Sequence, residues 1–194
     1  MALPIVQVGE AVLRARARAL SPEEIRTDAV QELIEQMKET MRAAPGVGLA
    51  APQIGLGLQL AVIEDREENL REIPQERLEE LERQPVPFHV IVNPQIVLGQ
   101  EKVEFFEGCL SVTGFAAAVA RARTVTVDCL NERAEPVHIE AIGWYARILQ
   151  HEIDHLHGNL YLDRMHRRSF MTVENYSKYW RENTHAQIRE AIGW

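Results

Sequence analysis

The pattern with the clearest chemistry is His151-Glu152-Ile153-Asp154-His155, an H-E-x-x-H run inside a segment that reads as a helix. Residues four apart lie on the same face of a helix, about one turn apart. His151 and His155 can therefore offer two imidazoles to one metal ion. Glu152 falls beside them, where a carboxylate can accept a proton from a water molecule on that metal. The pattern predicts metal-dependent hydrolysis at an electrophilic carbonyl.

A catalytic centre of this kind needs a third protein ligand, and Cys109 is the sequence candidate. It lies in Glu107-Gly108-Cys109-Leu110-Ser111, where the flanking glycine permits unusual backbone geometry and close approach. A thiolate beside a divalent cation is deprotonated, so the cysteine would be a ligand and not a nucleophile. Two imidazoles, one thiolate and one water would complete a tetrahedral site with an open position.

Local patterns predict the elements that position these residues. Asp28 is expected to cap a helix over 29–43, and four glycines in 46–57 indicate a tight, functional loop. Residues 169–191 are expected to form a polar surface helix or a dimer contact. The remaining predicted elements are strands over 58–63 and 88–98 (ended or bulged near Asn93-Pro94), a hairpin of 124–130 with 136–140, and a helix over 142–157 that stops at Gly158.

Residues 64–84 are dense in charge, with a short exposed helix expected from Pro74 through Glu82. We interpret this segment as a solvated insertion without a catalytic role, with a partner surface as the alternative. Strands grouped before the metal-bearing helix favour an α+β fold. Residues 1–194 are expected to form a single catalytic domain, with 169–194 as its polar C-terminal helix or tail.

Composition excludes several classes of function. The chain is 46% hydrophobic, has a net charge of -8 and has no Lys/Arg block, which argues against direct binding of nucleic acid. No apolar run approaches the roughly 20 residues of a membrane span. The N-terminus lacks the charged and apolar regions of a signal peptide, although it could be the mature end of a processed protein. Two cysteines favour a reducing compartment, with Cys129 as a small buried hydrophobe.

Three motifs taken together are more specific than H-E-x-x-H alone. They resemble, in order, the three signature motifs of peptide deformylases, over about residues 4–170. The insertion 64–84 and the run 143–148 resemble the eukaryotic organellar (type 1A-like) subgroup and related bacterial forms. The motifs are Gly46-Val47-Gly48-Leu49-Ala50-Ala51-Pro52-Gln53, Glu107-Gly108-Cys109-Leu110-Ser111 and Gln150-His151-Glu152-Ile153-Asp154-His155.

The resemblance implies a function and a metal centre. Peptide deformylases are hydrolases that remove the N-formyl group from the initiator methionine of nascent chains, an N-terminal processing step of protein biosynthesis. Cys109, His151 and His155 would hold one divalent metal, with Fe(II) as the native ion and zinc, nickel or cobalt as possible occupants. Glu152 would be the general base and later the acid. The implied fold has mostly antiparallel strands around a central metal-bearing helix.

The resemblance also assigns roles to other motif residues. The side-chain amide of Gln53 and the backbone N–H of Leu110 would stabilise the oxyanion. Gly48 and Gly108 would leave room for an extended peptide. The walls of the methionine pocket are expected to be Val47, Trp144 and Ile148, for which plain core packing is the alternative.

Behind the ligands, Glu107 and Arg121 are expected to form an ion pair that fixes the cysteine loop. The sequence leaves Asp154 open between its motif role and a cap or salt bridge, and Gln150 open between a donor to the site and a helix-face residue. The other histidines, His89, His138, His157, His166 and His185, are expected to lie away from the metal, on the surface or in the hairpin.

One position departs from the family pattern. Many members have an arginine after the cysteine motif, in Gly-Phe-Arg-Ala, whereas this chain has Gly114-Phe115-Ala116-Ala117. We therefore expect binding to depend less on a C-terminal carboxylate of the peptide than in arginine-bearing relatives.

The expected partners are N-formylmethionyl peptides and nascent chains at the ribosome, without direct contact to nucleic acid or membrane, and with a homodimer possible. The bacterial cytoplasm and the interior of a mitochondrion or chloroplast both suit the sequence. Three alternatives stay open. They are a zincin-like metallopeptidase with a His or Glu as third ligand, a closed structural zinc site for which Cys129 is the obvious fourth candidate, and an inactive deformylase homologue.

Overall fold

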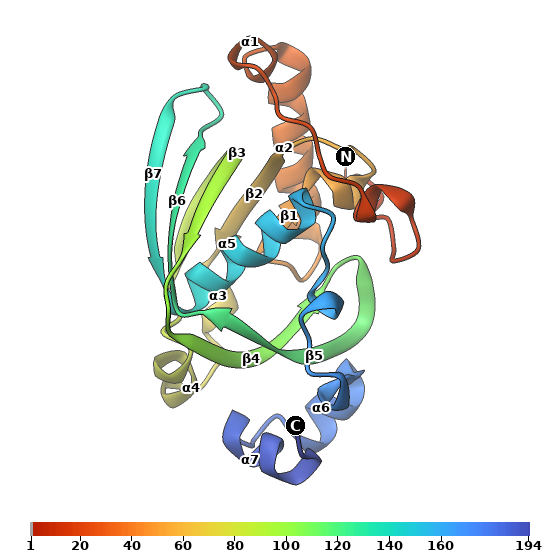
Figure 1. The fold of residues 1–194 in the computed structure, drawn as a ribbon, viewed down its shortest axis with the longest axis vertical. Helices are drawn as coiled ribbons and strands as arrows, with labels where there is room; N and C mark the ends of the chain where they lie inside the picture. Colours follow the sequence, from red (N-terminus) through yellow and green to blue (C-terminus); the bar gives the residue numbers. More distant parts are fainter. Residues whose placement is uncertain (1) are drawn as a thin grey trace.

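The computed structural model describes residues 2–194, in which two antiparallel sheets pack around one buried helix, α5 (Figure 1). The five-stranded sheet has the order β1-β2-β3-β6-β7 and the three-stranded sheet the order β4-β5-β8. The strands are β1 Gly48–Ala50, β2 Leu60–Asp65, β3 Val86–Leu98, β4 Lys102–Cys109, β5 Val112–Ala122, β6 Thr124–Leu130, β7 Pro136–Ile142 and β8 Met171–Thr172. The helices are α1 Pro22–Ile25, α2 Asp28–Ala43, α3 Glu67–Leu70, α4 Gln75–Glu80, α5 Gly143–Leu156, α6 Val173–Tyr179 and α7 His185–Ile192, with short 3-10 turns at Ala11–Arg14, Ala51–Ile54, Tyr161–Asp163 and Arg167–Ser169.

Strand β2 is buried on both faces, which explains why its first four residues, Leu60 to Ile63, form an unbroken apolar run. Leu60 and Val62 pack in one core with Met37 of α2, whereas Ile63 packs in a second core with Leu149 of α5. Successive side chains of a strand point to opposite faces, so each face of β2 contributes to a different core. The five-stranded sheet is thus covered by α2 on one side and by α5 on the other.

Helix α5 has a glycine at each end; the sequence predicted the one that follows it, Gly158, but not the one that begins it, Gly143. Gly143 begins it with φ +59, and a Cβ there would lie 2.4 Å from Cβ of Glu82. Gly158 follows its end with φ +76, where a Cβ would lie 2.6 Å from the carbonyl oxygen of Arg14. Only glycine fits either position, because both the backbone conformation and the space exclude a side chain.

Two other predicted elements are confirmed, one with a correction. The bulge near Asn93-Pro94 is present: Asn93 has φ +51, and the β3–β6 register shifts between Val92 and Gln95. The predicted cap of the 29–43 helix is wrong by one residue. Thr27 is the N-cap, and its hydroxyl accepts a hydrogen bond from the backbone of Val30. Asp28 lies in the first turn, where its charge favours the positive end of the helix.

The hairpin β4–β5 has no counterpart in the sequence-based expectations, yet it carries Cys109. Strand β5 is rich in alanine, which has a low strand propensity. Pairing compensates, because β5 lies against β4 from Lys102↔Ala122 to Gly108↔Ala116 and against β8 on its other edge.

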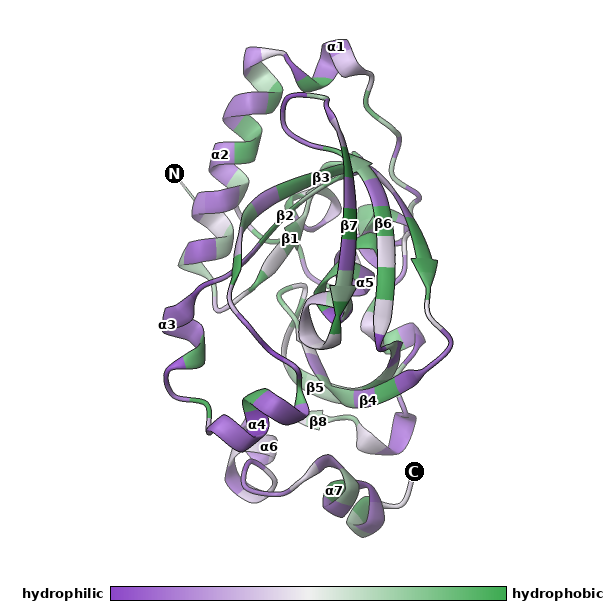
Figure 2. Cartoon of the chain, turned by 90° about the vertical axis from the view of Figure 1, so that its left-hand side faces the viewer, coloured by the Kyte–Doolittle hydropathy of each residue, from purple (hydrophilic) through white to green (hydrophobic). Residues whose placement is uncertain are grey.

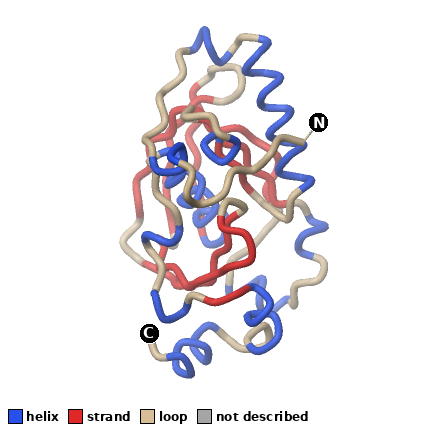
Figure 3. Tube along the Cα trace, turned by 90° about the vertical axis from the view of Figure 1, so that its right-hand side faces the viewer, coloured by secondary structure: helices blue, strands red, loops and turns tan. Residues whose placement is uncertain are grey.

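The C-terminal segment is not the single polar helix expected over 169–191. It contains β8, α6 and α7, grouped at one end of the molecule (Figure 3). Thr184 starts α7 through a capping box with Gln187, which divides the segment into two helices. His185 was expected at the surface, and this is wrong. It is buried against the rings of Phe105 and Phe106, and this burial lowers its pKa to about 4.

The charged segment 64–84 begins in the last two residues of β2 and continues as α3, α4 and their connections, which are mostly hydrophilic (Figure 2). Its two ends, in contrast, are buried, at Asp65 and at Leu81. The short exposed helix predicted there is confirmed as α4. Within residues 2–194, no helix has the length and apolar character needed to cross a bilayer.

Candidate active site

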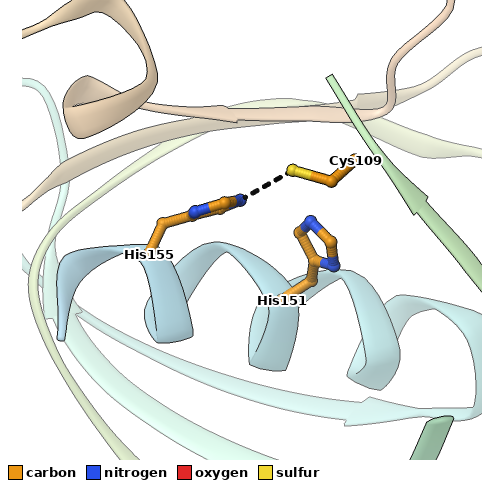
Figure 4. A group of neighbouring side chains, drawn as sticks. All are labelled: Cys109, His151 and His155. Carbon is orange, nitrogen blue, oxygen red and sulfur yellow. Dashed lines mark hydrogen bonds between the residues drawn. The ribbon is translucent and has the colours of Figure 1, made fainter. Parts of the chain in front are cut away.

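Three potential metal ligands meet between the two sheets. Cys109 ends β4, and His151 and His155 project from successive turns of α5 toward it (Figure 4). One ligand atom of each residue lies within 4.8 Å of the others, and Sγ of Cys109 is 3.3 Å from Nε2 of His155. The fold thus brings the predicted H-E-x-x-H histidines and the predicted third ligand to one point.

The donor set fits a catalytic divalent metal. A thiolate and two imidazoles suit zinc or iron, and three protein ligands leave a coordination position open. Nδ1 of His151 lies 3.1 Å from Oε2 of Glu107, which leaves the Nε2 of that ring for a metal. Among the described residues, this group has no fourth Cys, His, Asp or Glu, and Cys129 is not a member of it. The closed structural site therefore lacks its fourth ligand.

Glu107 is buried at the centre of a charged network behind the ligands. Arg121 donates to both of its oxygens at 2.9 Å, and Arg147 donates to Oε1 at 2.6 Å. Burial opposes ionisation of Glu107, but the charge and hydrogen bonds of Arg121 outweigh it and hold the pKa of this carboxyl well below its usual value. The predicted pair of Glu107 and Arg121 is present, and Arg147 is a third member that the sequence analysis missed.

The sequence left the roles of Asp154 and Gln150 open, and in the structure both side chains make contacts that stabilise the fold. Asp154 accepts hydrogen bonds from Arg121 and Arg164, so the salt-bridge reading is correct. Gln150 bonds the backbone of Ala122 twice: its Oε1 accepts from the N–H at 3.0 Å, and its Nε2 donates to the carbonyl oxygen at 2.8 Å. Gln150 therefore ties α5 to β5 and does not face the ligands.

Glu152 differs from Glu107 because its partners are few. Its side chain is buried, and Oε2 has no hydrogen-bond partner. Burial raises the pKa of this carboxyl to about 7. The carboxylate lies directly against Gly48, where a Cβ would be 2.3 Å from Oε1. Any larger residue at position 48 would thus displace the Glu152 side chain, a reason for glycine that is not evident from the sequence.

Gln53 and Leu110 lie next to Cys109, Gln53 through its side chain and Leu110 as the next residue of the chain. The side chain of Gln53 is fixed by a bond from the backbone N–H of Ala50 to Oε1, at 2.9 Å. Its Nε2 lies 3.6 Å from Sγ of Cys109 and 3.4 Å from Oγ of Ser111. Ser111 is fully buried and was missed by the sequence analysis, although it lies inside the cysteine motif.

A cavity of about 660 Å³ opens onto these groups, and we call it the site cavity. All five expected substrate-binding residues line it: Val47, Gly48, Gly108, Trp144 and Ile148. Gly108 has room for a Cβ, whose nearest neighbour would be 3.6 Å away, so the fold itself does not demand glycine there. Ala116 is buried in β5, where it pairs with Met171, and is not among the residues that line the cavity.

Other expectations for His and Cys residues are largely confirmed. His157 is exposed, one residue beyond the end of α5. His138 is exposed and pairs with Asp128, whereas His89 and His166 are half-buried and contact Tyr145 and Glu104. Cys129 is a buried free thiol in β6, and burial raises its pKa to about 11.

The family model described as "Polypeptide deformylase" matches residues 2–170. The chain is 47% identical over 172 residues to "Peptide deformylase 1A, chloroplastic/mitochondrial" of Arabidopsis thaliana, covering 88% of this chain and 64% of that protein. It is 44% identical over 192 residues to "Peptide deformylase 3" of Streptomyces avermitilis, covering 98% of this chain and 84% of that protein. The chain thus spans slightly less than two thirds of the plant relative.

Solved structures agree with these sequence relatives. A Met-Ala-Ser-bound crystal structure of a class I type b peptide deformylase from Acinetobacter baumannii superimposes with a TM-score of 0.75 at 32% identity, covering 85% of this chain and 99% of that chain. The α+β fold predicted from the resemblance is therefore confirmed, as is the likeness to organellar and related bacterial members. By its motifs, its fold and these relatives, the chain belongs to the peptide deformylase family.

Proposed function

We propose that this protein is a metal-dependent hydrolase that removes the formyl group from the N-terminal methionine of formylated peptides. The observation that supports this function best is the common cavity of Cys109, His151 and Glu152. It places a metal-binding group beside a buried carboxyl whose pKa of about 7 allows it to accept and release a proton near neutral pH.

The metal ligands in this proposal are Cys109, His151 and His155. A divalent ion held there would polarise the formyl carbonyl and make a water molecule more acidic. We infer that Fe(II) is the native ion, while zinc, nickel or cobalt also suit one thiolate and two imidazoles. Arg121, through Glu107, holds the ring of His151 in the orientation that binding requires.

Neighbouring residues would transfer the proton and stabilise the negative charge that develops on the substrate oxygen. Glu152 accepts the proton of the attacking water on its carboxylate and later delivers it to the departing amine. The Nε2 of Gln53 and the backbone N–H of Leu110 donate to the oxygen that gains negative charge. Because a bound cation lowers the pKa of Glu152 from about 7, we expect kcat to rise with pH and to level off by that value.

Substrate binding follows from the shape of the site cavity. Val47, Trp144 and Ile148 offer apolar walls for the methionine side chain, and Gly48 and Gly108 leave the extended peptide backbone room to approach. Ala116 provides no charge, so formylated peptides with a free or an amidated C-terminus should have similar KM values.

The wider context is also part of the proposal. We infer that residues 1–194 act as a single catalytic domain on nascent chains near the ribosome, because formylated N-termini arise there. A bacterial cytoplasm or the interior of an organelle would supply such chains, and relatives of both kinds match this sequence. Dimer formation through the C-terminal segment stays a prediction, to be measured by the mass in solution.

The decisive test is release of formate from formyl-Met-Ala-Ser by protein purified without oxygen, beside the variant Glu152→Ala. We expect release by the wild type and a loss of about 10²–10⁴-fold in the variant. Metal content is determined on both proteins, because the variant should still hold one ion per chain. A fully metal-loaded wild type that releases no formate would refute the proposed function, and cleavage of unformylated peptides would point to a metallopeptidase.

A further inference from the structure

The site cavity shares a wall with a second, smaller cavity of about 240 Å³, which we call the polar cavity. Five residues line both: Ala44, Pro45, Gly46, Val47 and Arg83. Arg83 alone among them has a long side chain, so it is the part of the wall that a substitution can remove. Beyond it, the polar cavity is lined by charged and amide side chains such as Arg42, Glu64, Arg66 and Asn69.

Arg83 is held firmly in this wall. Its Nε and Nη2 donate to the two oxygens of Asp65, at 2.8 and 3.0 Å. The Asp65 side chain is 0% exposed and the Arg83 side chain 12% exposed, so little solvent screens the pair. The guanidinium also lies 5.0 Å from the centre of the Trp144 ring, within the range of a cation–π contact. Moving it would leave a buried carboxylate without its cation, which is costly.

The position of Arg83 relative to the metal ligands is fixed by helix α5. Trp144 lies seven residues before His151, or about 10 Å along the helix axis. The backbone N–H of Trp144 donates to the carbonyl oxygen of Leu81 at 2.9 Å, and Glu82 pairs with Arg123 beside it. The end of the charged segment 64–84 is therefore hydrogen-bonded to the first turn of the helix that carries the histidines.

We propose that Arg83 is a specificity-determining residue that limits the length of the side chain accepted next to the formyl group. The inference rests on the proposed function and adds the substrate class: formylated peptides whose first side chain is no longer than about that of methionine. A longer chain meets the guanidinium and would have to displace it from Asp65 and Trp144. Without Arg83, the site cavity and the polar cavity become continuous and the limit disappears.

The experiment compares formyl-X-Ala-Ser peptides in which X is methionine, norleucine, 2-aminooctanoate or 2-aminodecanoate. The main variant is Asp65→Asn with Arg83→Ala, because the double change removes the cation without leaving its buried partner charged. Arg66→Ala is the matched control, since Arg66 lines the polar cavity but is not among the residues that line the site cavity. Arg83→Lys is the conservative variant, which keeps a cation opposite Asp65.

We expect the wild type to show a KM that rises about tenfold between norleucine and 2-aminooctanoate. The double variant should lose this rise, so that its KM for the 2-aminooctanoate peptide approaches its KM for the norleucine peptide. Arg66→Ala should keep the wild-type profile, and Arg83→Lys should restore part of the limit. A merely structural role would instead lower activity by one factor for all four peptides.

The dependence of KM on the length of the first side chain decides whether Arg83 limits that length. An unchanged length limit in the double variant, while formate is still released from formyl-Met-Ala-Ser, overturns this inference and leaves the proposed function standing. A wild type that releases formate from none of the four peptides overturns both. A shift of the optimum toward longer side chains in the double variant, with the control unchanged, supports the role of Arg83.

Discussion

Two buried carboxylates flank the histidines of α5, and their surroundings are opposite. Glu107 receives hydrogen bonds from Arg121, Arg147 and His151, whereas Oε2 of Glu152 has no partner. The same side chain is therefore locked in its charged form in one region and left able to gain or lose a proton in the other. The hydrogen-bond partners of a carboxyl, and not its burial alone, therefore decide whether it can serve as a base.

Among single substitutions at the two carboxylates, Glu107→Gln is expected to have the largest effect on stability. An amide cannot balance the two guanidinium groups: Arg121 would keep only Asp154 as an anionic partner, and Arg147 would lose the carboxylate that it contacts. We expect the free energy of unfolding to fall by about 3–5 kcal/mol and metal affinity to fall about 10–100-fold. Urea denaturation and metal titration measure the two effects. Glu104→Gln on the same strand is the control. Equal losses of stability and metal affinity in that variant would show that the network around Glu107 is not their cause.

The pH dependence of stability separates the two carboxylates by sign. Burial raises the pKa of Glu152 above its unfolded value of 4.5 to about 7, so its protonated form favours the folded state, and that contribution is lost as pH rises from 4.5 through 7. Glu107 has a lowered pKa, so its contribution is present above 4.5 and is lost in acid.

The metal-free variant Glu152→Gln should thus be more stable than metal-free wild type at pH 8, by up to about 3 kcal/mol. The difference should shrink toward pH 4.5. Chemical denaturation across this pH range measures it. Equal stability of the two proteins at pH 8 would mean that Glu152 is not held in a costly charged state.

A smaller change tests the position of Glu152 and not its charge. In Gly48→Ala, the new Cβ would lie 2.3 Å from Oε1 of Glu152 and would push the carboxylate aside. We expect kcat to fall about 10²-fold, the loss typical of a displacement near 1 Å. Gly57→Ala is the matched control, because a Cβ there meets nothing within 4 Å. Steady-state formate release compares the two, and an active Gly48→Ala would contradict the tight contact.

The smallest effect is expected far from both carboxylates. Arg14 pairs with Asp163, but their side chains are 45% and 39% exposed. Solvent screens such a pair, so Arg14→Gln should change the free energy of unfolding by no more than about 0.5 kcal/mol. Thermal unfolding beside Glu107→Gln gives the measurement. A large loss here would remove the contrast between buried and exposed charge on which the comparison depends.

The two histidine ligands could be predicted from the sequence because their spacing is local to one helix. His151 and His155 share a helix face at a spacing of four residues, and the glycines at 143 and 158 mark the ends of that helix. The hairpin β6–β7 was equally accessible, since its apolar residues alternate. For the histidine pair and for the hairpin, one short stretch of sequence contains all the residues on which the prediction depends.

Other parts of the site depend on contacts that no single segment reveals. Strand β5 is held by its neighbours and not by its own alanine-rich sequence. Arg147 showed one usable signal, because it precedes His151 by four residues and so faces the same side of the helix. Arg83 showed none: it lies in a charged segment that reads as solvated, and only the tertiary structure brings it to the cavity.

The two hydrogen bonds between Gln150 and Ala122 have a consequence for how α5 can move. A helix that turned about its own axis by one residue would swing each side chain by about 100°, and both bonds would break first. An uncharged amide thus prevents rotation of the helix that aims the two imidazoles. Because dissolved salt screens charges and not amide contacts, this restraint should hold at high ionic strength, where exposed ion pairs weaken.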